Sequence, residues 1–215
     1  MLLSSRPNIG DKKKIKHHLY GFISVKKYFS VGDWLRLTKT KIQECHKNKK
    51  IPIIVGGTGL YFNAITRGLS QIPDIDKKTR DKVRNLFKKL GYKRFYNMLL
   101  KIDPKIKNKI LATDTQRTQR VYEVFIKTKK SLFDWILNTK SDFTHYDIKK
   151  IFLNIPKDEL LKKISIRTES MFKKGCIKEV KKFNSLKLNK SLSANKLIGV
   201  REITDFLKGL ITLEN

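Results

Sequence analysis

Cysteine is scarce in this sequence. Only Cys45 and Cys176 occur among 215 residues, and neither stands at a spacing typical of a zinc site or a disulfide framework. No apolar run approaches the length of about 20 residues that crosses a bilayer, and Met1–Arg6 is too short for a secretory signal. These absences predict a soluble protein of the reducing cytoplasm that does not associate with membranes.

Acidic residues are also few. The 19 Asp and Glu face 49 Lys and Arg, which gives a net charge of +30. A surface this positive attracts polyanions, and nucleic acid is the partner that the charge favours. The alternative is compositional, because lysine outnumbers arginine and Ile and Asn are frequent, which an AT-rich genome also produces.

The usual catalytic patterns are missing. No Ser-His-Asp or Cys-His arrangement can be assembled, and no Gly-x-x-x-x-Gly-Lys-Ser/Thr phosphate loop occurs anywhere. His17 and His18 are adjacent, so on a strand they point to opposite faces and do not share a metal. No catalytic residue and no metal ligand is therefore assigned from local patterns.

The most informative segment that is present runs from Ile51 to Tyr61. Its β-branched residues predict a buried strand, and the glycines from Gly56 predict a tight turn. Thr58 is placed to cap a helix that begins near Leu60. Free N–H groups at such a turn suit an anion or a nucleotide edge, although many turns of this kind are merely tight.

The order of predicted strands and helices in the rest of the chain indicates an α/β protein with a helical insertion. Further strands are expected near 19–23 and 151–155, and the segment 73–137 reads as a series of short charged helices. Ser30 and Asp33 form a capping-box pattern before another helix. Three strands are too few for a stable doubly wound sheet, so the sheet is expected to be incomplete.

Several basic side chains are candidate ligand contacts. Gln116 and Arg120 lie one helical turn apart, where an amide and a guanidinium suit base edges and phosphates; the alternative is a solvated basic helix. Arg167 has helical spacing with apolar residues, so it is expected to face partly inward toward a carboxylate or a phosphate. Looser candidates for phosphate contact are Arg80 with Arg84, and Lys196 with Arg201.

The order of the motifs resembles the tRNA dimethylallyltransferase family, also called tRNA isopentenyltransferases. The resemblance extends over nearly the whole chain. In chain order, the motifs are Arg6-Pro7, His17-His18-Leu19, Ser30-Val31, Pro52–Tyr61, Gly68-Leu69-Ser70, Asp103-Pro104, Asp114–Arg117 with Arg120–Val124, and Ile198-Gly199.

This resemblance implies a fold and a reaction. The expected fold is a P-loop NTPase-like parallel sheet core, incomplete at its N-terminus, formed by residues 1–72 and 138–215, with an all-helical tRNA-binding insertion at 73–137. The implied reaction transfers a dimethylallyl group from dimethylallyl diphosphate to N6 of the adenosine 3′ of the tRNA anticodon, with Mg²⁺ assisting. The implied enzyme is a monomer that flips the target base out of its stack.

Residue by residue, the resemblance also implies binding roles. Arg167 matches an arginine that holds the diphosphate. Lys196 and Val200 stand where the family more often has arginine and tyrosine, which puts that contact segment in question. The implied tRNA contacts are Thr58, Arg80, Gln116, Arg117, Arg120, Lys196 and Arg201.

Two family motifs have no counterpart in this sequence. They are the N-terminal phosphate loop and an Asp-Ser-x-Gln-x-Tyr segment whose aspartate is the general base, and losing such preorganised groups costs factors of hundreds or more in rate. We therefore expect the chain alone to bind tRNA weakly and not to catalyse the transfer. Two alternatives are a non-catalytic RNA-binding remnant, and an adenylate isopentenyltransferase acting on free nucleotides, which the large helical insert disfavours.

Overall fold

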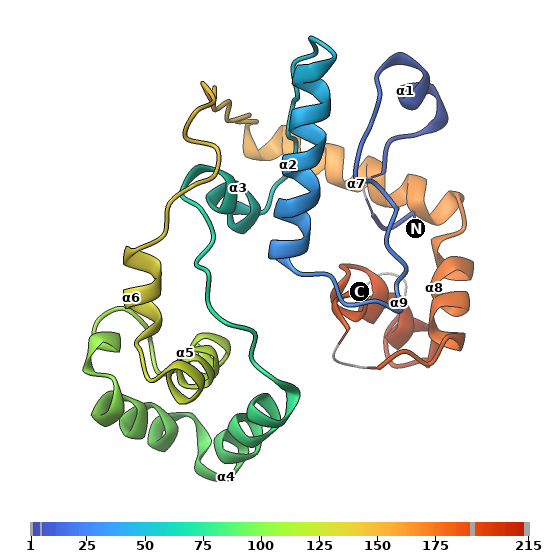
Figure 1. Cartoon of the computed structure of the whole chain (residues 1–215). Coiled ribbons are helices and arrows are strands. Elements are labelled where there is room, and N and C mark those ends of the chain that lie inside the picture. The colour runs from blue at the N-terminus through green and yellow to red at the C-terminus, as the bar shows by residue number, and fades with distance from the viewer. Residues whose placement is uncertain (1, 5, 190–191, 213–215) are drawn as a thin grey trace. The chain divides into compact units, whose positions relative to one another are not determined.

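The described part of the protein is built from helices and connecting loops. The computed structural model describes residues 2–4, 6–189 and 192–212, and it divides the chain into two compact units. Unit 1 comprises Met1–Gly56 and Ile148–Asn215, and unit 2 comprises Gly57–Asp147. Figure 1 shows coiled ribbons and no arrows along these ranges. None of their helices combines the length and apolar character that a bilayer crossing requires.

The expected P-loop-like parallel sheet is therefore wrong for the described residues. The predicted strands at 19–23, 51–55 and 151–155 have no regular secondary structure. A strand exists only when a neighbouring strand completes its hydrogen bonds, and no described segment pairs with any of the three. Their apolar side chains consequently face solvent: Ile53 is 82% exposed and Phe152 is 88% exposed.

Unit 1 is a set of short helices with a small apolar core. The core joins Cys176 and Val180 of α8 to Ile203 of α9, and the Asn184 amide donates to the Thr204 hydroxyl at 2.9 Å beside it. The helices are α1 (Ile9–Lys14), α2 (Val31–Lys47), α7 (Lys157–Lys173), α8 (Cys176–Ser185) and α9 (Val200–Leu207), with a 3₁₀ turn η2 (Ser193–Lys196).

The predicted capping box at the start of α2 is confirmed. The Ser30 hydroxyl accepts from the Asp33 N–H at 3.1 Å, and the Asp33 carboxylate accepts from the Ser30 N–H at 3.0 Å. Each bond satisfies a donor that the helix itself leaves free. The pattern was readable in the sequence because both partners lie within one helical turn.

Unit 2 is an all-helical body whose main layer is α4 against α5. Gly91 interrupts α4 with φ 70° and ψ 169°, a left-handed backbone that glycine adopts without strain. A glycine inside a helical pattern is a sequence signal for such a break. The elements are α3 (Gly59–Thr66), α4 (Lys77–Ile102), the 3₁₀ turn η1 (Pro104–Ile106), α5 (Thr115–Thr128) and α6 (Leu132–Leu137).

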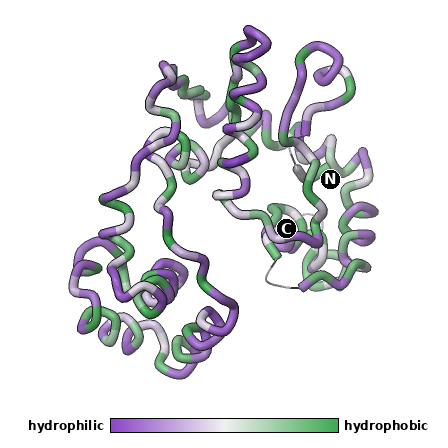
Figure 2. The backbone as a smooth tube through the Cα atoms, viewed as in Figure 1, coloured by the Kyte–Doolittle hydropathy of each residue, from purple (hydrophilic) through white to green (hydrophobic). Residues whose placement is uncertain are grey.

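Aromatic and branched residues fill the core of unit 2. Phe95 is fully buried, and its ring makes edge-to-face contacts with Phe87 and Tyr122 at centroid distances of 5.2 and 5.5 Å. Val121 of α5 belongs to the same cluster. Figure 2 shows that hydrophilic positions are spread over both units, as expected for a chain of charge +30.

A buried hydrogen bond joins the ends of three elements in unit 2. The Ser131 hydroxyl donates to the Asp103 carboxylate at 2.7 Å, and the two residues are only 5% and 3% exposed. Asp103 is the C-cap of α4 and accepts from the Lys105 N–H at the start of η1. Ser131 accepts from the Phe133 N–H at the start of α6. This contact fixes where α6 leaves the α4–α5 layer.

We expect Ser131→Ala to loosen this junction selectively. It removes a helix cap and leaves a buried carboxylate oxygen without its donor, a combination that costs about 1–3 kcal/mol. Amide hydrogen exchange of the full chain should show faster exchange in α6 and in the last turn of α4. The control Ser185→Ala removes an exposed hydroxyl from α8, and it should change stability by less than about 0.5 kcal/mol. Unchanged exchange in α6 for Ser131→Ala would contradict this role.

Candidate nucleic-acid interface

The first turns of α5 present the predicted polar face. Asp114 caps the helix by accepting from the Arg117 N–H at 3.1 Å. The helix begins with Thr115, so Gln116 and Arg120 lie one turn apart, as predicted. Gln116 and Arg117 are exposed and Arg120 is half-buried. One helix end thus offers an amide and two guanidinium groups to a ligand.

Each arginine of this face already has an acidic neighbour. Arg117 Nε lies 3.4 Å from an Asp114 oxygen, and Arg120 Nη1 lies 3.5 Å from an oxygen of Glu123. The Arg117 side chain is 73% exposed, and exposed pairs of this kind contribute about 1 kcal/mol or less. A phosphate can therefore displace the carboxylate at little energetic cost, while the carboxylate holds the guanidinium in place beforehand.

Arg80 lies at the other end of the α4–α5 layer. It is in the first turn of α4, whose cap Asp76 accepts a 3.2 Å hydrogen bond from Lys127 in the last turn of α5. Gln116 and Lys127 are eleven residues apart on one helix, or roughly 16 Å. The structure therefore does not bring Arg80 next to the Gln116 face.

The contact of Asp76 with α5 persists at neutral pH. Hydrogen bonds from the N–H and hydroxyl of Thr79, together with Lys127, lower the pKa of Asp76 to about 2. The carboxylate is therefore ionised and pairs with Lys127 over the whole physiological range. This pair holds the start of α4, and Arg80 with it, against α5.

One N–H donor of the Arg80 guanidinium group has no acceptor among the described residues. Its Nη2 lies 3.6 Å from an oxygen of Asp74, whereas its Nε is buried and has no hydrogen-bond partner among the described residues. A buried donor without a partner is unfavourable. The Arg80 side chain as a whole is 43% exposed, so part of it is accessible to a ligand, which is compatible with the predicted tRNA contact.

Thr58 opens α3 without capping it. It occupies the N-cap position, but its side chain makes no capping hydrogen bond and is exposed. Gly56, Gly57 and Gly59 are not among the residues with positive φ, so the expected special turn conformation is absent. A side chain at Gly57 or Gly59 would meet no other described atom within 4 Å. The hydroxyl is open to a ligand, and its predicted contact with tRNA stays a prediction.

Three predicted residues belong to unit 1. Lys196 in η2 and Arg201 in α9 are exposed, and Arg201 Nε lies 3.6 Å from an Asp205 oxygen. Arg167 is also exposed, on a helix with no buried residue. The expectation that Arg167 faces inward is wrong, because the apolar face of α7 on which it was based is itself uncovered. Its diphosphate role stays a prediction.

Sequence patterns did not single out Lys130 and Trp135 of unit 2. The ammonium of Lys130 lies 5.2 Å from the centroid of the Trp135 ring. An aromatic residue among lysines is a usable signal for nucleic-acid binding. It is weak on its own, because most aromatic residues belong to a core.

The described residues contain no group of three or more His, Cys, Asp or Glu side chains that could hold a metal ion. Mg²⁺ in phosphate chemistry is often bound through one or two carboxylates and the substrate's own phosphates, so the expected Mg²⁺ stays a prediction.

The sequence profile of one family, IPP transferase, matches residues 2–215. Among curated proteins, the chain is 50% identical over 213 residues to the tRNA dimethylallyltransferase of Pelagibacter ubique, covering 99% of this chain and 68% of that protein. It is 37% identical over 214 residues to that of Rickettsia massiliae, covering 99% and 59%. The chain thus spans about three fifths to two thirds of these relatives.

Solved structures agree with the sequence matches. The full-length tRNA isopentenylpyrophosphate transferase of Bacillus halodurans superposes with a TM-score of 0.62 at 28% identity, covering 99% of this chain and 66% of that one. A eukaryotic dimethylallyltransferase acting on tRNA gives 0.79 at 21% identity, covering 97% and 53%; at this identity the likeness shows the fold alone. The chain belongs to the IPP transferase family.

Proposed function

We propose that this protein takes part in tRNA modification by dimethylallyl transfer. The proposed reaction moves the dimethylallyl group of dimethylallyl diphosphate to N6 of the adenosine 3′ of the anticodon, with diphosphate as the leaving group. The observation that carries the proposal is the polar face of α5, where Gln116, Arg117 and Arg120 stand together at one helix end in a chain of this family.

The chemistry of this face suits an RNA loop. Guanidinium groups bind phosphates through paired hydrogen bonds, and a glutamine amide can pair with an adenine edge. Curated relatives named tRNA dimethylallyltransferase support tRNA as the substrate. A net charge of +30 adds long-range attraction for the RNA backbone.

The small-molecule partners are part of the same proposal. Arg167 on α7 is the proposed diphosphate ligand, and its exposed guanidinium is accessible to an anion. Mg²⁺ is the proposed cofactor, held mainly through the oxygens of the diphosphate, whose charge it neutralises. We take the active species to be a monomer in the cytoplasm, where its tRNA substrate is found.

The finer proposal concerns the 215 residues by themselves. We infer that they bind tRNA but do not complete the transfer, because the sequence contains neither a Gly-x-x-x-x-Gly-Lys-Ser/Thr loop nor the Asp-Ser-x-Gln-x-Tyr segment. Preorganised N–H donors of a phosphate loop stabilise the departing diphosphate. Under this proposal the chain acting alone binds tRNA weakly and forms no dimethylallyl product.

We expect the double variant Arg117→Ala/Arg120→Ala to weaken tRNA binding and to reduce its salt dependence. Each lost phosphate contact should lower the slope of log K against log salt by about 1. Fluorescence anisotropy of labelled tRNA at several salt concentrations measures both quantities.

The matched control is the double variant Arg94→Ala/Lys101→Ala, which removes two positive charges from exposed positions in the second half of α4 in the same unit. If binding reflected only a lysine-rich composition, the two double variants would weaken binding equally. Equal loss would overturn the assignment of the α5 face, whereas a larger loss for the α5 variant supports it.

The transfer step has its own test. The full 215-residue chain is incubated with dimethylallyl diphosphate, Mg²⁺ and unmodified tRNA, and the digested nucleosides are analysed by mass spectrometry for N6-dimethylallyl adenosine. We expect tRNA binding without product. Multiple turnovers per chain would refute the finer proposal while leaving the family reaction intact.

A further inference from the structure

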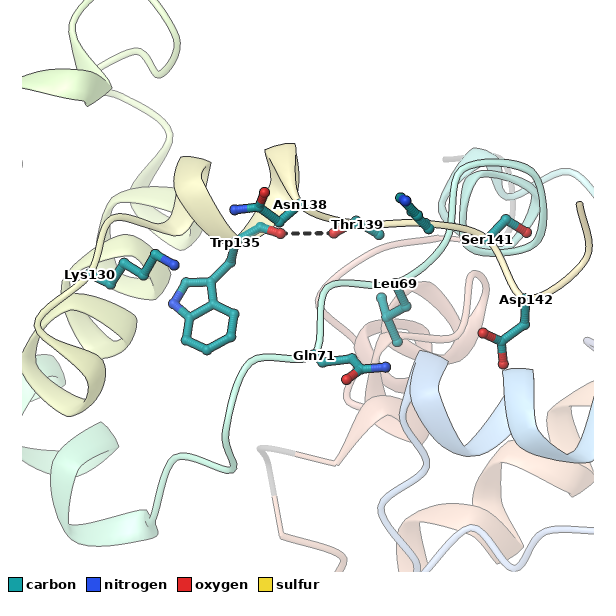
Figure 3. A pocket seen from close by; sticks show the side chains of 9 residues that line it. Leu69, Gln71, Lys130, Trp135, Asn138, Thr139, Ser141 and Asp142 are labelled. Atoms are coloured by element: carbon teal, nitrogen blue, oxygen red, sulfur yellow. Dashed lines mark hydrogen bonds between the residues drawn. The ribbon is translucent and has the colours of Figure 1, made fainter.

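A recess of about 360 Å³ lies within unit 2, between the end of α6 and the segment that follows α3. Its volume lies at the lower end of the range typical of ligand sites, about 300–1,000 Å³. Figure 3 shows the indole of Trp135 extending from α6 into this space, with the Gln71 side chain across from it. Among the polar and charged side chains that line it are those of Gln71, Lys130, Asn138, Lys140 and Asp142.

The aromatic wall of the recess is fixed in place. Trp135 Nε1 donates to the Thr128 hydroxyl at 3.3 Å, and the Thr139 hydroxyl donates to the Trp135 carbonyl at 2.9 Å. Lys130 Nζ lies 5.2 Å from the ring centroid, within the range of cation–π attraction. The indole is half-buried. A ring held by both its nitrogen and its backbone needs little ordering when a ligand stacks on it.

The opposite wall of the recess is the segment 69–71, which contacts the loop that follows α6. The hydroxyls of Ser70 and Thr139 lie 2.7 Å apart, and the Ser141 hydroxyl donates to the Ile65 carbonyl. Gly68 has φ +93°, and any side chain there would collide with the Lys140 carbonyl. This close backbone approach holds the segment 69–71 beside the loop after α6, so both walls of the recess persist in the free protein.

We propose that this recess binds one unstacked base of a single-stranded RNA nucleotide, with the base on the Trp135 ring and the phosphate at Lys130 or Lys140. The inference rests on the proposed function and deepens it by adding a nucleotide subsite elsewhere in unit 2, beside the C-terminal end of α5. Stacking on an aromatic ring accepts any base, and unstacked loop bases are the usual targets of RNA-binding proteins.

The polar groups of the recess match a base better than an apolar ligand. Asn138 donates through Nδ2 to the Asp134 carbonyl at 2.9 Å, which leaves its amide oxygen as an acceptor for a base N–H. Gln71 is exposed on the opposite wall and offers both a donor and an acceptor. Asp142 adds a negative charge to the lining, which disfavours direct phosphate contact on that side.

Fluorescence of Trp135 provides the test. In a Trp34→Phe background it is the only tryptophan, and the probe is an anticodon stem-loop RNA carrying a fluorescent label for anisotropy. We expect RNA binding to quench Trp135 emission, and Trp135→Ala to raise the Kd by about 5- to 150-fold, the range for loss of one stacked base. The salt slope of the Trp135→Ala variant should stay unchanged, because no charge is removed.

Further variants keep the test decisive if Trp135→Ala disturbs folding. Gln71→Ala alters only an exposed side chain and should raise the Kd, and Lys130→Ala should lower the salt slope by about 1. Lys208→Ala, an exposed lysine of unit 1, is the charge control. Binding seen by anisotropy with neither quenching nor any effect of Trp135→Ala and Gln71→Ala would overturn the subsite and leave tRNA binding standing. No RNA binding by the parent chain would overturn both.

Discussion

The hydrogen bond between Ser131 and Asp103 is the contact on which the arrangement of unit 2 depends. It is buried and 2.7 Å long, and its two residues together cap α4, η1 and α6. Buried polar groups are tolerated only when they are paired, so the carboxylate admits few positions for Ser131. Through it, the well-packed α4–α5 layer determines where α6 begins and hence where Trp135 stands.

The polar face of α5 and the recess beside α6 therefore share one scaffold. The carboxylates near Arg117 and Arg120 lie 3.4 and 3.5 Å away. The Arg117 pair is exposed and weak, so phosphate can replace its carboxylate, whereas the Glu123 carboxylate beside Arg120 is only 8% exposed. If both proposals hold, a helix end that binds phosphate and an aromatic recess would give an RNA loop a charge contact and a stacking contact. Such a combination is typical of recognition of single-stranded RNA.

Features that depend on neighbouring residues were predictable from the sequence. The capping box of Ser30 and Asp33, the start of α5 after Asp114 and the break at Gly91 each need only one turn of chain. The prediction of a strand at 51–55 was wrong. β-branched residues only favour the extended conformation, and a strand also needs a second segment with which to form backbone hydrogen bonds. The prediction that Arg167 faces inward was wrong for a related reason. No described residue covers the apolar face of α7 enough to bury that face.

The recess could not be predicted because its walls are about seventy residues apart in the chain. Ser70 meets Thr139, and Gly68 meets Lys140, which no local periodicity encodes. The motif order that resembles the family singled out the α5 residues, whose contacts with tRNA stay a prediction. It did not mark Trp135, whose position follows from the packing of α6.

Hydrogen exchange of the full chain with and without tRNA tests the central claim, that unit 2 recognises the RNA, most directly. The account predicts that bound tRNA slows exchange in the first turns of α5 and in the loop after α6. Protection confined to unit 1, with the start of α5 and residues 138–142 unaffected, would contradict it.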